Sequence, residues 1–126
     1  MIDFKNGASI FPKMKPADNK EFASLVSPMF VPGEMIIACY KGIRDGVVFT
    51  SKRIITINVQ GVTGKKKDFT SLPYGRIQAY SVETAGLLDY DCELDLWFSG
   101  LGHVRIEFIN TMNIAEICKL ISEKVL

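Results

Sequence analysis

The stretch CELDLWFSGLGHVRIEF, residues 92–108, indicates most clearly what kind of fold this chain adopts. Apolar and polar residues alternate over 92–98 and again over 103–108, which is the period of a strand with one buried face. The segment between them, 99–102, contains two glycines and is typical of a turn. We therefore predict a β-hairpin with an apolar inner face and a polar outer face.

Upstream of this hairpin, further strand-length segments are separated by turn residues. They are residues 35–40, 47–50, 53–59, 65–72 and 77–84. Within 53–59, Ile54, Thr56 and Asn58 form the more polar of two alternating sets, so we expect this set to face solvent. Together with the hairpin, these segments predict a mainly β fold in which seven antiparallel strands curl into a barrel or sandwich.

Helical spacing occurs at both ends of the chain. Asp18 and Glu21 form a pattern typical of a capping box, which predicts a short helix at about 18–27 after an N-terminal arm. From Asn113 onward, apolar residues recur on one helical stripe, with Asn113 and Glu116 as the N-cap and its partner. We expect this terminal helix to close the open end of the sheet. The arm and short helix take residues 1–31 and the main domain takes 32–126, within one structural domain.

Composition limits the classes of function. The 126 residues include 15 Lys plus Arg and 14 Asp plus Glu, so a net charge of +1 gives no global attraction to nucleic acid, which we do not expect as a partner. Cys39, Cys92 and Cys118 are widely spaced and odd in number, which favours free thiols in a reducing compartment. With no secretion signal and no apolar run long enough for a membrane span, we expect a cytoplasmic protein.

The sequence offers no catalytic constellation. His103 is the only histidine, and alternation places it on the outer face of its strand, away from any triad or dyad. One histidine and three scattered cysteines also give no metal-ligand pattern. We therefore expect no catalytic residues, no metal site and no cofactor.

Acidic residues alternate with other residues just before and within the hairpin. They are Asp89, Asp91, Glu93 and Asp95. Either they form one solvated face of a strand, or they pair with the basic Lys65–Lys67 segment of a neighbouring copy, which would cover an exposed sheet edge. Trp97 lies on the same outer face and is expected under the N-terminal helix or in a subunit interface. The candidate interface residues are thus Glu93, Asp95 and Trp97.

Basic residues gather near two strand connections. The segment GVTGKKK, residues 61–67, superficially resembles a phosphate-binding loop, but it joins two strands and lacks the first glycine and the final Ser or Thr. It is either a solvated turn or a local anion site. Lys41 and Arg44 flank the glycine of the first connection and could point into one space. The candidate ligand-binding residues are Lys41, Arg44, Lys65, Lys66 and Lys67.

Several spaced motifs together resemble a known family. They are FTSKRII at 49–55, VQGVTGKKK at 59–67, LPY at 72–74, SVETAG at 81–86, and Glu93-Leu94 with Ser99-Gly100. The chain resembles the bacterial pleckstrin-homology-like domains from about residue 32 to its end. This resemblance implies a seven-stranded, strongly bent antiparallel barrel capped by a C-terminal helix, and an assembly into ring-forming homo-oligomers. The eukaryotic lipid-binding pattern also needs more basic residues near the first connection and a tryptophan in the last helix, and this chain departs from it at both places.

Two functions follow as hypotheses. In the first, the chain is a non-catalytic scaffold that assembles with itself and presents a surface to another, unidentified protein. In the alternative, it is a peripheral binder of anionic lipid or of a small phosphorylated ligand through its basic loops.

Overall fold

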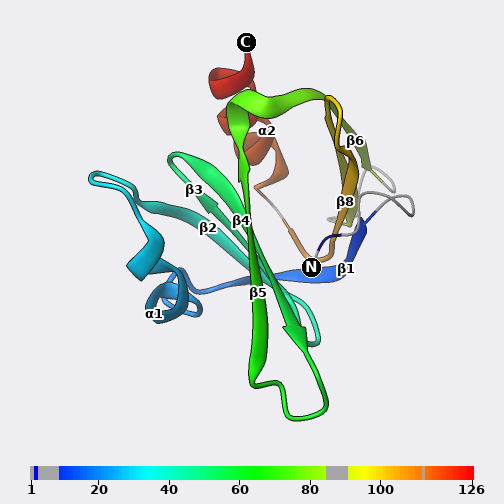
Figure 1. Cartoon of the computed structure of the whole chain (residues 1–126). Helices are drawn as coiled ribbons and strands as arrows, with labels where there is room; N and C mark the ends of the chain where they lie inside the picture. Colours follow the sequence, from blue (N-terminus) through cyan, green and yellow to red (C-terminus); the bar gives the residue numbers. More distant parts are fainter. Residues whose placement is uncertain (1, 3–8, 85–90, 112) are drawn as a thin grey trace.

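The computed structural model describes residues 2, 9–84, 91–111 and 113–126 (Figure 1). The elements are, in chain order, β1 (Ser9–Ala17), α1 (Ala23–Val26), η1 (Ser27–Met29), β2 (Ile36–Lys41), β3 (Gly46–Thr50), β4 (Arg53–Gln60), β5 (Lys66–Pro73), η2 (Tyr74–Arg76), β6 (Ile77–Thr84), β7 (Cys92–Phe98), β8 (Gly102–Phe108) and α2 (Ile114–Val125). The strands form one curled sheet in the order β5-β4-β3-β2-β1-β8-β7-β6. The mainly β fold with a C-terminal helix is confirmed. None of the described helices is long and apolar enough to cross a membrane.

The described strands number eight rather than the predicted seven, because the N-terminal arm contributes β1. This strand pairs antiparallel with β2 and parallel with β8. Its pairing shifts register between Phe11 and Met14, and Lys13 between them has a φ of 51°. The irregularity turns both Phe11 and Met14 into the core, although they are three residues apart. A bulged strand of this kind has no sustained period of two, so the sequence pattern does not reveal it.

The predicted β7–β8 hairpin is confirmed, and its apolar face lies in the core. Leu94, Leu96, Val104 and Ile106 are fully buried. This inner core extends across the curled sheet to Ile117 and Ile121 of α2, which closes one opening of the sheet (Figure 1). Burial of such side chains contributes about 1.5–3 kcal/mol each, so the helix and the hairpin stabilise one another.

The expectation that Ile54, Thr56 and Asn58 face solvent is wrong for the first two. Ile54 and Thr56 are fully buried, and so is Ile57 of the alternating set. The reason is that this set faces inward, with Ile54 in the inner core, while Phe22 and Val26 of the α1 region cover the alternating set that includes Ile57, in a second apolar cluster on the outer side of β2–β4. A strand covered on both sides shows no polar face.

The N-terminal helix is much shorter than 18–27, and the predicted capping box does not form. The side chain of Asp18 instead accepts a hydrogen bond from the Lys20 amide at 2.8 Å, which is a local turn. Glu21 forms an ion pair with Lys41. At the other end, α2 follows Asn113 as predicted, but the Asn113 side chain makes no capping bond and accepts a hydrogen bond from the Tyr40 hydroxyl at 2.8 Å.

Candidate functional site

The outer face of β6, β7 and β8 carries three rows of side chains that run across the strands. The pairing register sets Ala79, Trp97 and His103 in the first row, Ser81, Asp95 and Arg105 in the second, and Glu83, Glu93 and Glu107 in the third. We call the third row the glutamate row. The predicted position of His103 on the outer face is confirmed, because it lies opposite Trp97.

Asp95 is the centre of a compact polar cluster. Its Oδ1 lies 2.6 Å from His103 Nε2 and accepts a hydrogen bond from Arg105 Nε at 2.8 Å. Burial raises the pKa of this carboxyl group, but the hydrogen bonds from Arg105 and His103 outweigh it and hold the pKa below its usual value. Asp95 is only 5% exposed, so the prediction of a solvated strand face is wrong at this position.

Trp97 is not covered by the N-terminal helix. It is 40% exposed, and its indole stacks on the His103 ring with the two centroids 4.9 Å apart. The helix packs instead on the cluster formed by β2, β3 and β4. The expected position under the N-terminal helix is therefore wrong, and the other expected position, a subunit interface, stays a prediction.

The glutamate row lies beside a hollow at the end of the hairpin sheet. This hollow has a volume of about 340 Å³, and Glu83, Asp91, Glu93 and Glu107 contribute to its lining. Arg105 Nη1 lies 3.5 Å from Glu93 Oε2, so this cation is shared between Glu93 and Asp95. Like charges directly opposite one another on neighbouring strands are destabilising. A cationic group that binds beside the glutamate row would therefore reduce this repulsion. Asp89, also predicted for the acidic face, lies outside the described residues.

The predicted basic residues separate into two places. Lys41 Nζ lies 2.6 Å from Glu21 Oε1, in an exposed ion pair. Arg44 donates a hydrogen bond to the carbonyl of Gly61, and Asp45 Oδ1 accepts one from the amide of Val59 at 3.0 Å. The 42–45 loop is thereby held against the turn that precedes the lysines.

The lysines Lys65, Lys66 and Lys67 are exposed at the β4–β5 hairpin, which extends beyond the rest of the sheet (Figure 1). Lys67 Nζ donates to the carbonyl of Gly64 at 3.2 Å. Gly61 and Gly64 have φ values of 79° and 69°, so both use the left-handed conformation that glycine adopts easily. We call residues 61–67 the lysine hairpin.

Sequence reasoning missed two aliphatic side chains at these loop tips. Ile43 is 91% exposed in the 42–45 loop, and Val62 is 104% exposed in the lysine hairpin. Because Arg44 bonds to Gly61, the two loops that carry them are joined. An aliphatic residue beside the glycine of a turn is the sequence signal that points to such a tip.

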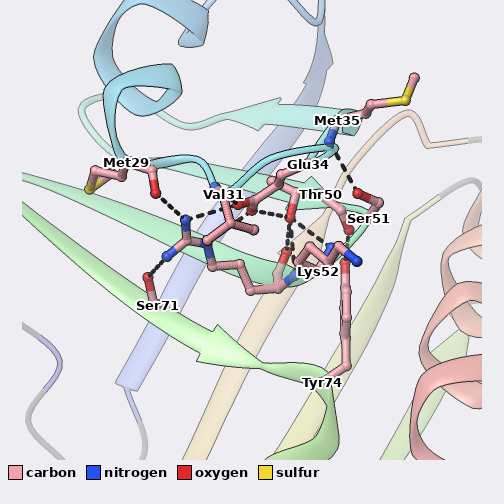
Figure 2. A network of polar contacts seen from close by, with 10 residues as sticks. Met29, Val31, Glu34, Met35, Thr50, Ser51, Lys52, Ser71 and Tyr74 are labelled. Atoms are coloured by element: carbon pink, nitrogen blue, oxygen red, sulfur yellow. Dashed lines mark hydrogen bonds and ion pairs between the residues drawn. The ribbon is translucent and has the colours of Figure 1, made fainter.

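A second missed feature is a buried carboxylate, Glu34, whose side chain has no exposed surface (Figure 2). Its Oε2 accepts hydrogen bonds from Thr50 Oγ1 at 2.7 Å and from Arg53 Nε at 2.9 Å. Its Oε1 accepts bonds from Arg53 Nη2 at 3.0 Å and from the Val31 amide at 3.1 Å. Burial raises the pKa of Glu34, but these hydrogen bonds and the charge of Arg53 hold it below the usual value.

Arg53 extends this network to two further elements. Its Nη2 donates to the Met29 carbonyl at 2.6 Å, and its Nη1 donates to Ser71 Oγ at 2.9 Å. The network thus connects η1 and the turn after it to β3, β4 and β5, and its role is structural. Among the described residues, no group of three or more His, Cys, Asp or Glu side chains could hold a metal ion.

This curled sheet, closed by a C-terminal helix and connected by charged loops, is the architecture of a pleckstrin-homology-like domain. The family model described as "Bacterial PH domain" matches residues 6–125, and the chain belongs to that family.

Relatives and solved structures agree with this assignment. The chain is 44% identical over 96 residues to the protein YjqA of Bacillus subtilis, covering 75% of this chain and 77% of the relative. It is similar to the crystal structure of a DUF1696 family protein with a pleckstrin-homology domain from Shewanella loihica, with a TM-score of 0.77 and 38% identity over 90% of this chain and 98% of that one. A pleckstrin homology domain from Shewanella amazonensis has a TM-score of 0.64 and 41% identity, covering 87% and 90% of the two chains.

Proposed function

We propose that this chain is a non-catalytic, cytoplasmic scaffold that assembles into a homo-oligomer and presents a surface to a protein partner. The observation that carries the proposal is the separation of opposite charges on one molecule. The lysine hairpin gathers exposed cations, and the glutamate row with Asp91 gathers carboxylates around a hollow. Complementary patches at different places on one subunit attract a second copy of the same chain.

The cytoplasmic part of the proposal rests on the thiols. Cys39, Cys92 and Cys118 are all free, and the first two are buried. Free thiols at every cysteine are typical of proteins from a reducing compartment.

Light scattering across a dilution series, at low and moderate salt, tests the assembly. We expect a stable multiple of 14.1 kDa. Reversing two partly exposed charges of the glutamate row, Glu93→Lys with Glu107→Lys, should lower the mass at a given concentration. Lys119→Glu is the control, because Lys119 is exposed on α2 and belongs to neither patch. A monomer at every concentration and salt level would contradict the proposal.

A second candidate function is favoured by the loop tips. Ile43 and Val62 are exposed aliphatic side chains on two joined loops, beside Arg44 and the three lysines. Peripheral membrane proteins combine aliphatic groups that enter the membrane–water interface with cations that attract anionic lipid. Each Lys or Arg near the membrane surface contributes about 1 kcal/mol to binding. The same cations can also hold a small phosphorylated ligand.

Vesicle co-sedimentation distinguishes this candidate from the first. Vesicles of phosphatidylserine and phosphatidylcholine should retain the chain at low salt, whereas vesicles of phosphatidylcholine alone should not. Ile43→Asn with Val62→Asn should reduce binding, and Leu101→Asn is the control, since Leu101 is exposed on the β7–β8 turn. If anionic vesicles retain nothing at low salt, the membrane function is excluded. Titration with inorganic phosphate tests the small-ligand alternative separately.

A further inference from the structure

We propose that a hollow at one end of the sheet binds a ligand that carries a carboxylate beside an apolar group. The hollow has a volume of about 580 Å³. It lies between the turn that joins β7 to β8 and the segment of η2 and early β6, where the chain crosses from β5 to β6 (Figure 1). Pockets that bind small ligands typically have volumes of about 300–1,000 Å³. Neither the glutamate row nor the lysine hairpin lines this hollow, so the inference goes beyond the proposed function and does not depend on it.

The backbone on both sides of the hollow shapes it. The pairing of β6 with β7 shifts register at Gln78, which interrupts the regular ladder there. On the other side, the Leu101 amide donates a hydrogen bond to the Phe98 carbonyl at 3.1 Å and fixes the turn. Gly75 also lines the hollow, and a Cβ built on it would meet no heavy atom within 4 Å. The space is therefore open beside the backbone of η2.

Arg76 determines the charge of the ligand. Among the described residues that line the hollow, it is the only charged one. The other three arginines, Arg44, Arg53 and Arg105, bond to carbonyl or carboxylate oxygens of the chain. Arg76 is exposed, and its guanidinium makes no hydrogen bond or ion pair within the described part of the chain. A guanidinium offers a planar pair of donors that matches a carboxylate, so the hollow attracts an anion.

The single cation favours a carboxylate over a phosphate group. A phosphate monoester carries a charge of about −1.5 to −2 at pH 7, and the sites that bind it gather several cations or backbone amides. Here Arg76 supplies one positive charge, and the Gln78 amide and the Ser99 hydroxyl supply neutral hydrogen-bonding groups. A carboxylate carries one negative charge and needs only one guanidinium.

Leu101 determines the rest of the ligand. It lines the hollow and yet is 56% exposed, beside Ile77 and Phe98, which belong to the inner core. An aliphatic or aromatic group next to the carboxylate would cover Leu101 and remove apolar surface from water. Free carboxylic acids such as N-acylated amino acids have this chemistry, and so does the C-terminus of a polypeptide that ends in an apolar residue. Capture of a C-terminal carboxylate is an established mode of peptide recognition.

NMR of the chain with ¹³C-labelled leucine methyl groups tests the site. N-acetyl-leucine should shift the Leu101 signals and reach saturation with a Kd of about 1–10 mM, which is typical of a ligand of this size. N-acetyl-leucinamide has the same apolar group without the charge. It should bind at least about tenfold more weakly, because it cannot make a charged hydrogen bond with Arg76. Equal affinity of the two compounds would overturn the proposal.

Two variants locate the binding site in the hollow. Arg76→Gln should weaken the binding of N-acetyl-leucine at least about tenfold. The matched control is Lys119→Gln, which removes an exposed cation of α2 and should leave the affinity unchanged. Gly75→Leu places a side chain in open space, so it should abolish binding while the chain keeps its melting temperature. If both hollow variants bind N-acetyl-leucine as the natural chain does, the inference is wrong.

Peptides distinguish the two sources of the carboxylate. A short peptide that ends in leucine is titrated with a free and with an amidated C-terminus. If the free peptide binds at least about tenfold more tightly than N-acetyl-leucine and the amidated peptide does not bind, a polypeptide C-terminus is the ligand. Equal affinity of the free peptide and N-acetyl-leucine identifies a free carboxylic acid. If neither of them shifts the Leu101 signals, the carboxylate site is refuted, and the proposed assembly is judged separately by light scattering.

Discussion

The substitution Glu34→Gln should destabilise the fold strongly. Both carboxylate oxygens of Glu34 accept hydrogen bonds from donors, with Thr50 and Arg53 on Oε2 and Val31 and Arg53 on Oε1. An amide places an NH₂ group against donors in either orientation, and it leaves Arg53 without its counter-charge. Removing one partner of a buried ion pair costs about 3–5 kcal/mol. With a urea m-value of about 1.5 kcal/mol/M, the unfolding midpoint should fall by about 2 M or more.

Urea denaturation followed by tryptophan fluorescence and by circular dichroism measures this midpoint. The matched control is Glu21→Gln, which removes the exposed pair between Lys41 and Glu21, whose side chains are 55% and 36% exposed. Exposed pairs contribute about 0–1 kcal/mol, so this control should shift the midpoint by well under 1 M. If Glu34→Gln unfolds within about 0.5 M of the natural chain, the network does not contribute the stability argued from its geometry.

The carboxylate of Glu34 should also make the free energy of unfolding depend on pH, and the sign of this dependence follows from its pKa. The pKa of Glu34 in the folded chain lies below its usual value of 4.5, so the folded state binds fewer protons there than the unfolded state. The stability from this carboxylate is therefore present above pH 4.5 and is lost as the pH falls through the folded pKa. The difference in unfolding free energy between the natural chain and Glu34→Gln should accordingly be largest near neutral pH and shrink on acidification, when both are titrated with urea. A difference that grows toward low pH would contradict this sign.

Two further predictions concern packing and thiol reactivity. A Cβ on Gly46 would lie 2.5 Å from the Phe22 ring, so Gly46→Ala should lower the stability by about 1–3 kcal/mol in thermal denaturation, whereas Gly75→Ala, with open space around it, should be nearly neutral. Equal melting temperatures for the two variants would refute the contact. Burial raises the pKa of Cys39 to about 11, and Cys118 is less buried, so iodoacetamide at pH 8 should modify Cys118 first, as followed by mass spectrometry. Earlier modification of Cys39 would show that its site opens readily.

The parts of the fold that the sequence predicts are those with one buried and one exposed face. The β7–β8 hairpin and α2 have such faces, and their apolar residues lie in the core as expected. Elements without this asymmetry are not predicted correctly from the alternation of apolar and polar residues. A bulge in β1 turns Phe11 and Met14 inward against the period of two, and β4 is apolar on both sides because Phe22 and Val26 cover its outer face.

The candidate site was predictable as a set of residue types but not as an arrangement. The position of His103 on the outer face follows from alternation, whereas the burial of Asp95 depends on Arg105 and His103, which reach across from the next strand. The contact between Arg44 and Gly61 joins two loops, and the Glu34 network joins residues from four separate segments. No local pattern encodes such contacts, because the fold itself brings the partners together.

The central place of β1 constrains how this chain acquires its structure. Residues at the beginning of the chain pair with residues near its end, as Ser9 does with Val104. Contacts between such distant residues form slowly, because the intervening chain must first lose its conformational freedom. During synthesis from the N-terminus, β1 emerges early and β8 late, so Phe11 and Met14 lack their contacts with β8 until that strand has left the ribosome. The sheet is therefore completed as one of the last events of folding, and the nascent chain depends on remaining unaggregated until then.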